Sequence, residues 1–257
     1  MPGFDAIEDN LHATLAAFAS AKPSGEMRAL AGVSVASSGV QYSMFNSAVL
    51  TAPVASPREL RQRIETAAGF FETRGLAWSF WVCQGWLESG VRGVVADIFY
   101  RCGLHEVAEL PGMEAQRLEP AARPLPSLEF RRVCNAATRA DFSAIMTVAF
   151  GLPPQVAREI YEPAGTWDAG LTGWLGYSGN VAVTSAATFA TGSAVGIYAV
   201  GTPVVHRRRG FAEAVVRHAV AEAGADRLSV LESSEAGLLL YRRLGYRTVT
   251  RYAVFAT

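Results

Sequence analysis

The sequence predicts a mixed α/β fold that is built as two domains, and three observations lead to this prediction. The chain has 257 residues, which is more than most single domains contain and suits two domains of roughly 100–150 residues each. Half of its residues are hydrophobic and 18% are charged, so there is ample material for a buried core. Helix-like and strand-like patterns also alternate on both sides of a proline-rich segment.

The proline-rich segment covers residues 119–126 and holds three prolines within seven positions. Proline fixes φ and has no backbone N–H, so a segment of this kind is extended and interrupts regular structure. We therefore expect a domain boundary here, with one domain over residues 1–120 and a second over residues 128–257.

In the N-terminal half the patterns predict the order helix, strand, strand, helix, strand, helix, strand. The clearest helix start has Ser56 as the N-cap, Pro57 at the first helical position and Glu59 completing a capping box. The predicted helices cover residues 5–20, 57–73 and 86–101, and the predicted strands cover 27–37, 42–50, 76–82 and either 106–110 or 115–118.

In the C-terminal half the predicted order is strand, two helices, three strands, helix, strand, helix, strand. The residues from Thr138 to Asp141 have the spacing of a capping box, so we expect a helix that starts there and ends near Gly151. The other predicted helices cover 153–161, 210–223 and 235–244, and the predicted strands cover 129–133, 173–177, 181–190, 194–200, 227–232 and 246–255.

The composition argues against several classes of protein. Lys and Arg together number 23, as do Asp and Glu, and this balance gives no reason to expect nucleic acid or an anionic membrane as a partner. We expect Cys83, Cys102 and Cys134 to be reduced, buried thiols, and because the four histidines are scattered we expect no metal. The start of the chain does not resemble a secretory signal, and no window reaches the roughly 18 apolar residues of a membrane span. A soluble, cytoplasmic protein is expected, as a monomer or a homodimer.

One segment of the C-terminal half has the properties of a phosphate-binding loop. An apolar strand ends near Thr202, three arginines follow at Arg207, Arg208 and Arg209, and a helix then begins at Gly210. The free N–H groups and the dipole at a helix N-terminus favour an anion, and a glycine lets a phosphate oxygen approach the backbone. Taken alone, these residues fit a solvated basic turn equally well.

The spacing Arg207-x-x-Gly210-x-Ala212 resembles the CoA-binding signature Gln/Arg-x-x-Gly-x-Gly/Ala of the GCN5-related N-acetyltransferase (GNAT) superfamily. Residues 231–246 resemble a second signature of that family, in which a strand ends, a Ser-x-x-Gly helix start follows and the helix closes with Tyr-x-x-Leu-Gly-Phe/Tyr. Two segments in the right order are more specific than either alone. The resemblance covers roughly residues 129–257 and implies a mixed, mostly antiparallel central sheet flanked by helices.

The resemblance also implies a reaction, with acetyl-CoA as co-substrate and the amine of a small molecule or peptide as acceptor. Backbone groups of Tyr198 and Val200 would pair with the pantetheine arm, and the amides from Arg208 to Ala212 would hold the pyrophosphate. Tyr241 would protonate the leaving thiolate, or else only pack beneath the cofactor. The implied cofactor-binding residues are Tyr198, Val200, Thr202, Arg207, Arg208, Arg209, Gly210, Phe211, Ala212 and Ser234.

The sequence departs from the family pattern at two points. The family often has proline three residues before the motif arginine, whereas Val204 stands there in this chain, which we expect to change the shape of the loop more than its chemistry. No general base is evident either, because the strands 181–190 and 194–200 contain no Asp or Glu. The open candidates are Glu162, Asp168, His206 and Glu232.

The N-terminal half has an element order similar to a reduced copy of the same fold but lacks the phosphate signature. It is therefore either a degenerate GNAT-like domain or an unrelated accessory module, and Asn46 is a candidate for contacting an acceptor between the two domains. For the whole chain, an N-acetyltransferase competes with a non-catalytic acyl-CoA-binding regulatory protein. The zero net charge and the CoA signature weigh against a third class, an aminoacyl-transferring relative that uses charged tRNA.

Overall fold

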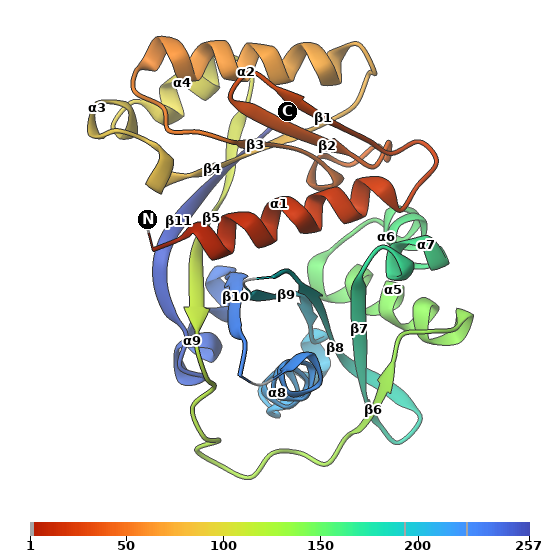
Figure 1. Cartoon of the computed structure of the whole chain (residues 1–257). Coiled ribbons are helices and arrows are strands. Elements are labelled where there is room, and N and C mark those ends of the chain that lie inside the picture. The colour runs from red at the N-terminus through yellow and green to blue at the C-terminus, as the bar shows by residue number, and fades with distance from the viewer. Residues whose placement is uncertain (1–2, 193, 225) are drawn as a thin grey trace.

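The computed structural model describes residues 3–192, 194–224 and 226–257, and these residues form one continuous sheet of 11 strands (Figure 1). The strand order is β1-β2-β3-β4-β11-β5-β10-β9-β8-β7-β6. The strands are β1 (Glu26–Leu30), β2 (Val33–Ser37), β3 (Asn46–Leu50), β4 (Ser79–Cys83), β5 (His105–Ala115), β6 (Glu129–Arg132), β7 (Leu171–Ser178), β8 (Val181–Ala190), β9 (Ala194–Gly201), β10 (Leu228–Glu232) and β11 (Arg247–Ala256).

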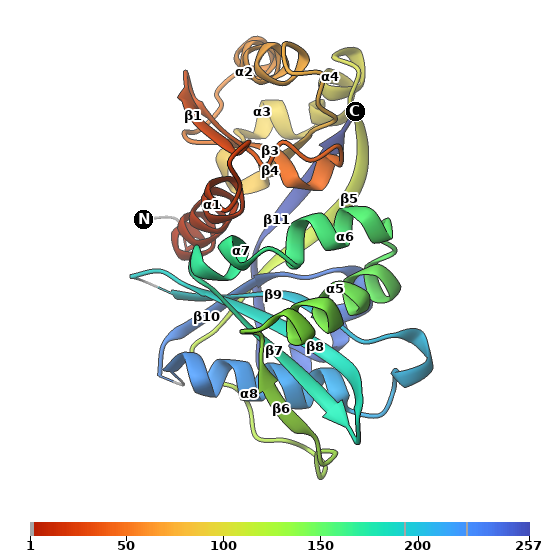
Figure 2. The same cartoon turned by 90° about the vertical axis from the view of Figure 1, so that its right-hand side faces the viewer.

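Helices cover both faces of this sheet. The α-helices are α1 (Asp5–Ser20), α2 (Pro57–Glu72), α3 (Ser89–Arg92), α4 (Val95–Arg101), α5 (Ala136–Phe150), α6 (Pro154–Tyr161), α7 (Ala164–Asp168), α8 (Phe211–Gly224) and α9 (Glu235–Arg243), and the 3-10 turns are η1 (Ser43–Phe45), η2 (Gln84–Trp86) and η3 (Val204–His206). Figure 2 shows α8 on one face of the C-terminal part of the sheet and α5, α6, α7 and α1 on the other. Among the described strands, β3–β4 and β9–β10 pair in parallel and the other neighbours pair antiparallel. The predicted mixed, mostly antiparallel sheet is confirmed.

The two halves of the chain share the centre of the sheet. β5 from the N-terminal half lies between β10 and β11, and β11 from the C-terminal half lies between β4 and β5. Pro111 stands inside β5, where its carbonyl accepts a hydrogen bond from the amide of Ser233 at 2.9 Å. The segment 119–126 contains no helix or strand, as expected, although the sheet itself continues across the expected boundary.

Capping explains where several helices begin. Ser56 caps α2 by accepting the amide of Glu59, and the Glu59 carboxylate accepts the amide of Ala55 rather than that of the cap itself. The expected cap at Thr138 is wrong, because α5 begins three residues earlier. Asn135 is the cap and accepts the amide of Thr138, whose hydroxyl in turn accepts the amide of Asn135.

Four further predictions for the N-terminal half are corrected. The strand predicted over 27–37 is a hairpin of β1 and β2 that turns at Gly32, where φ is +73°. The helix predicted over 86–101 is divided into η2, α3 and α4, with glycines at 90 and 93 that lower helix propensity. The last strand, predicted over either 106–110 or 115–118, is the single strand β5. The first part of the strand predicted over 42–50 is the 3-10 turn η1, and the strand β3 begins only after it.

Helix α1 connects the two halves of the molecule (Figure 1). Asn10 is fully buried, donates to the Phe189 carbonyl at 3.0 Å and accepts the Tyr198 hydroxyl at 2.7 Å. A Cβ on Gly196 would lie 1.8 Å from the Asn10 side-chain oxygen. The absence of a side chain at Gly196 is therefore what allows α1 to lie directly on β9.

Candidate active site at a fork between two parallel strands

The parallel strands β9 and β10 pair only along part of their length. Their register runs from Ala194 opposite Leu228 to Gly196 opposite Val230, and β9 then continues to Gly201 without pairing to β10. We call the unpaired region, formed by residues 197–201 of β9 and 231–232 of β10, the fork. An extended ligand inserted there would meet strand edges whose backbone groups are not used by the neighbouring strand.

A bulge in β9 shapes the fork. The register between β8 and β9 shifts between the pairs formed by Ser185 and Ala187, and Ala199 has a φ of +50°, which is rare for a residue with a side chain. The Ser185 hydroxyl donates to the Ala199 carbonyl at 3.0 Å and holds this conformation. The bulge bends β9 at Tyr198 and Val200, the two positions expected to contact a pantetheine arm.

The loop after β9 presents a row of backbone N–H groups. In the described part of the chain, the amides of residues 208–213 form no hydrogen bond with another backbone group or with a side chain. Arg208 and Gly210 both have positive φ, +63° and +83°, and alternation of this kind turns successive amides toward one point. Because the residue before α8 is glycine, no side chain caps these donors, and they form a cradle for an anion.

Other groups hold the loop in position. Arg207 donates from Nε to the Thr202 carbonyl at 3.0 Å and from Nη2 to the Ala149 carbonyl at 3.5 Å, so part of its guanidinium supports the loop. The Thr202 hydroxyl is 2.9 Å from that of Thr184. Arg208 and Arg209 are exposed, while Phe211 is buried and anchors the first turn of α8.

The linker between the halves crosses this loop, which the sequence did not indicate. A Cβ on Gly210 would lie 3.2 Å from Cδ of Pro126 and 3.8 Å from Nη2 of Arg123. The linker thus bounds the cradle on one side and brings a fourth arginine to it. No local pattern reveals this contact, because it joins residues that are distant in sequence.

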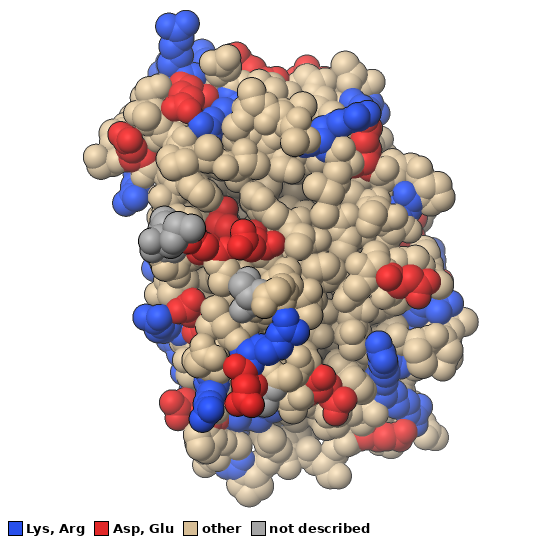
Figure 3. All heavy atoms as spheres, in the orientation of Figure 1, with Lys and Arg blue, Asp and Glu red and all other residues tan. Residues whose placement is uncertain are grey.

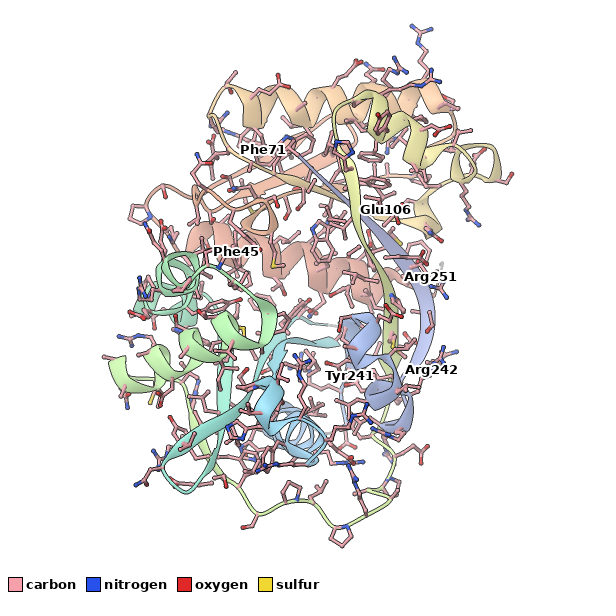
Figure 4. The ribbon with its side chains drawn as sticks, turned by 180° about the vertical axis from the view of Figure 1, so that it is seen from behind. Phe45, Phe71, Glu106, Tyr241, Arg242 and Arg251 are labelled. Carbon is pink, nitrogen blue, oxygen red and sulfur yellow. The ribbon has the colours of Figure 1, made fainter. Side chains whose placement is uncertain are left out.

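Tyr241 lies on the same face of the fork as α8. It is 7% exposed, packs with Ile197, Val216 and Leu231, and makes an edge-to-face contact with Tyr246. Burial raises the pKa of its phenol well above the ordinary value, so the proton is retained at neutral pH. Figure 4 shows Tyr241 on the side of α9 that faces α8, with Arg242 on the outer side.

The start of α9 explains the second sequence signature. The Ser234 hydroxyl caps the helix by accepting the amide of Gly237 at 3.3 Å. A Cβ on Gly237 would lie 2.8 Å from the Tyr241 ring. In the Ser-x-x-Gly start, the serine therefore begins the helix and the glycine makes room for the tyrosine one turn later.

The opposite face of the fork is covered by α1. Glu232 is the last residue of β10 and lies across from Gly112 of β5, where a side chain would meet Tyr252 and Ile7. Since cross-strand partners point to the same face, the Glu232 side chain is on the α1 side, as is Tyr198 through its bond to Asn10. The two faces of the fork thus carry different groups, with Tyr241 on one and Glu232 on the other.

The four residues considered as a general base lie in different parts of the structure. Glu162 ends α6, Asp168 is exposed on α7, and His206 lies in the loop before the cradle. Glu232 alone of these four belongs to a strand of the fork. Its Oε1 is buried and has no hydrogen-bond partner among the described residues, and burial together with the charge of Glu8 raises its pKa to about 8.

Asn46 does not face a ligand, so the hypothesis that it contacts an acceptor is wrong. It is fully buried, and its amide donates to the carbonyls of Val40 at 2.7 Å and Ala77 at 2.9 Å. Its side-chain oxygen accepts a hydrogen bond from the Ser37 hydroxyl. Its polar atoms serve to hold the backbone segments before β3 and before β4 in place.

Over the described ranges, no group of three or more His, Cys, Asp or Glu side chains is arranged to hold a metal ion. No helix of the described residues is both long and apolar enough to cross a membrane. Cys83 is buried, Cys102 is partly buried and Cys134 is exposed, which corrects the expectation that all three thiols are buried.

The architecture matches that of solved acetyltransferase structures. No protein-family profile matches the chain, and no curated protein is significantly similar to it. A GCN5-related N-acetyltransferase from Kribbella flavida has a TM-score of 0.74 and 19% identity, over 100% of this chain and 96% of that one. A tandem GNAT protein from the clavulanic acid biosynthesis pathway has a TM-score of 0.51 and 11% identity, over 97% of this chain and 95% of that one. The chain therefore has the fold of the GCN5-related N-acetyltransferases along its whole length.

Proposed function

We propose that this protein is an N-acetyltransferase that transfers the acetyl group of acetyl-CoA to a primary amine by direct attack in a ternary complex. The observation that carries the proposal is the row of unbonded amides over residues 208–213, placed directly beside the fork. The amides would bind the pyrophosphate of CoA, and the fork would take the pantetheine arm along the edge of β9. The acetyl thioester would then lie between the two faces of the fork.

The residues of this chain would contribute in three ways. The cradle and the fork bind and orient the thioester, which lowers the entropy loss of the reaction. Tyr241, which keeps its proton because it is buried, donates it to the departing thiolate. The amine approaches from the α1 face and attacks the carbonyl carbon as the C–S bond breaks.

We further propose that the N-terminal half is a second, degenerate GNAT-like unit. The arrangement of β1, β2, β3, α2 and β4 repeats that of β7, β8, β9, α8 and β10, including the parallel last pair. At α2, however, the helix start is filled by its own side chains, because Ser56 and Glu59 each accept a nearby amide. A phosphate would find fewer free donors there than at the cradle, so one CoA should bind per chain. Isothermal titration would measure this ratio, and two equivalents would overturn the assignment.

The function is tested with acetyl-CoA and a library of amines, by following release of the CoA thiol. Turnover of at least one amine above background is expected. Binding of CoA without thiol release for any amine would instead favour a non-catalytic acyl-CoA-binding protein. If CoA did not bind at all, both functions would be ruled out.

Two variants test the site itself. Gly210→Val should abolish CoA binding, because φ is +83° and the new side chain would meet Pro126 and enter the cradle. Tyr241→Phe should lower kcat about 10²-fold while leaving CoA affinity nearly unchanged. Gly75→Val offers a control, since Gly75 also has positive φ (+61°) but no atom lies near its Cβ position and it is far from the fork. Unchanged CoA affinity in Gly210→Val, or unchanged kcat in Tyr241→Phe, would contradict the assigned roles.

A further inference from the structure

Two carboxyl groups from different halves of the chain lie close together on the α1 face of the fork. Glu8 of α1 is 5% exposed, and it accepts hydrogen bonds from the Trp86 indole and the Tyr252 hydroxyl, both at 2.5 Å. Glu232 lies across from Gly112, where a side chain would come within 3.0 Å of the Tyr252 ring, and the hydroxyl of that ring is bonded to Glu8. The charge of Glu8 accordingly contributes to the raised pKa of Glu232. The two donors fix the Glu8 carboxylate in place, and neither of them carries a positive charge.

No cation of the described residues neutralises this pair. Glu232 forms no ion pair within the described ranges, and the basic group that Glu8 approaches is His12, at 3.7 Å. Burial lowers the pKa of His12, so it is uncharged at neutral pH.

The other titratable groups facing the pair are neutral as well. Tyr198 on β9 and Tyr252 on β11 have pKa values raised well above 10, mainly by burial. Burial, together with Glu8, raises the pKa of the Cys83 thiol on β4 to about 12. The site therefore combines acidic groups with neutral ones, and Oε1 of Glu232 is left without a partner.

A buried carboxylate without a countercharge is unfavourable, and a bound cation that hydrogen-bonds to the pair would offset that cost. The surface around the site favours the approach of a cation. Figure 3 shows acidic side chains gathered over the N-terminal part of α1, the part that also carries Asp5 and Asp9.

We propose that the acceptor binds as a protonated primary amine between Glu8 and Glu232, so that the N-terminal half supplies one side of the acceptor site, and that Glu232 removes the proton before attack. This inference rests on the proposed acetyl transfer. One ammonium proton passes to Glu232, and the freed nitrogen lone pair forms the C–N bond as the C–S bond breaks. The nitrogen loses a second proton to solvent, while Tyr241 protonates the thiolate and is reprotonated by solvent. Glu232 then releases its proton to solvent, which restores the base and leaves a net release of one proton per turnover.

Glu8 is a binding group in this scheme and Glu232 a catalytic one, so their variants should differ. With the best amine found in the library, Glu8→Gln should raise KM at least tenfold with a smaller change in kcat. Glu232→Gln should lower kcat and remove the rise of kcat/KM with pH near pH 8, since kcat/KM reports the proton affinity of the free enzyme. Asp9→Asn is the matched control, because it removes the same charge from an exposed position on the same helix, where water and salt screen it, and it should raise KM far less than Glu8→Gln does. An unchanged KM in Glu8→Gln would overturn the proposal.

A binding measurement separates this proposal from the proposed function. Methylammonium chloride should raise the Tm of the wild type at pH 9 above its value in NaCl of equal ionic strength, since a ligand of the folded state stabilises it. The increment should be lost in Glu8→Gln and kept in Asp9→Asn. Equal increments in the wild type and Glu8→Gln would refute the cation site, even if acetyl transfer is observed. Absence of acetyl transfer with the increment intact would refute the proposed function and leave the cation site standing.

Discussion

Replacing Glu232 with glutamine should stabilise the protein, and the gain should depend on pH. The pKa of Glu232 is raised from 4.5 to about 8, first by burial and then by Glu8. The folded state thus holds this proton more tightly than the unfolded state does. The protonated carboxyl contributes stability that is fully present below about pH 4.5 and is lost as the pH rises to about 8. Glutamine mimics the protonated form and does not ionise.

The size of the effect follows from the same values. A tenfold change in proton affinity corresponds to about 1.4 kcal/mol, so a pKa raised from 4.5 to about 8 corresponds to about 5 kcal/mol at pH 9. Water reaches the partly exposed side chain and screens part of this energy, so we expect a measured gain of about 2–3 kcal/mol. At pH 5 the gain should be under about 1 kcal/mol.

The assay is urea unfolding of the wild type and Glu232→Gln between pH 5 and pH 9. The difference in the free energy of unfolding should grow steadily up to about pH 8 and then level off. Glu65→Gln on the exposed face of α2 is the control and should show no such trend. A difference between wild type and Glu232→Gln that does not vary with pH would refute the buried, uncompensated carboxyl.

Two further predictions concern packing and reactivity. Gly196→Ala should lower the free energy of unfolding by more than about 2 kcal/mol, because its Cβ would lie 1.8 Å from the Asn10 oxygen. Gly69→Ala is the control, since its Cβ would lie in open space on α2, and it should be neutral or stabilising in the same chemical denaturation experiment. Equal effects of the two substitutions would contradict the close approach of α1 to β9. Iodoacetamide should label the exposed Cys134 much faster than Cys83, whose pKa is raised to about 12 by burial. Mass spectrometry of partially labelled protein measures the order of labelling, and faster labelling of Cys83 would contradict its burial.

Local conformation was the part of the site that could be predicted from the sequence. Gly210, the arginines before it and Tyr241 belong to short segments whose residue types directly restrict the backbone. The sequence also predicted α1 and α2 closely, because apolar periodicity and the cap at Ser56 are local signals. It failed over residues 86–101, where the glycines at 90 and 93 lower helix propensity and the chain forms η2, α3 and α4 instead of one helix.

Contacts between distant segments could not be predicted in this way. Periodicity indicates that a strand exists but does not select its neighbours, so the exchange of β5 and β11 between the halves was not foreseen. The passage of Arg123 over the cradle is a contact of the same kind. Which strands become neighbours depends on how all the strands and helices of the fold pack against one another.

The sequence by itself determined two local conformations, a helix that begins directly after three arginines and a glycine and a serine-capped helix that carries a tyrosine, since both are encoded within a few consecutive residues. The tertiary structure decided what stands on the other face of the fork. Glu8, Trp86 and Tyr252 come from three elements, and the first and last are separated by 244 positions. They meet only because α1 packs across the sheet and β11 crosses into the N-terminal half. Burial at that meeting point, which no sequence pattern specifies, gives Glu232 its altered proton affinity.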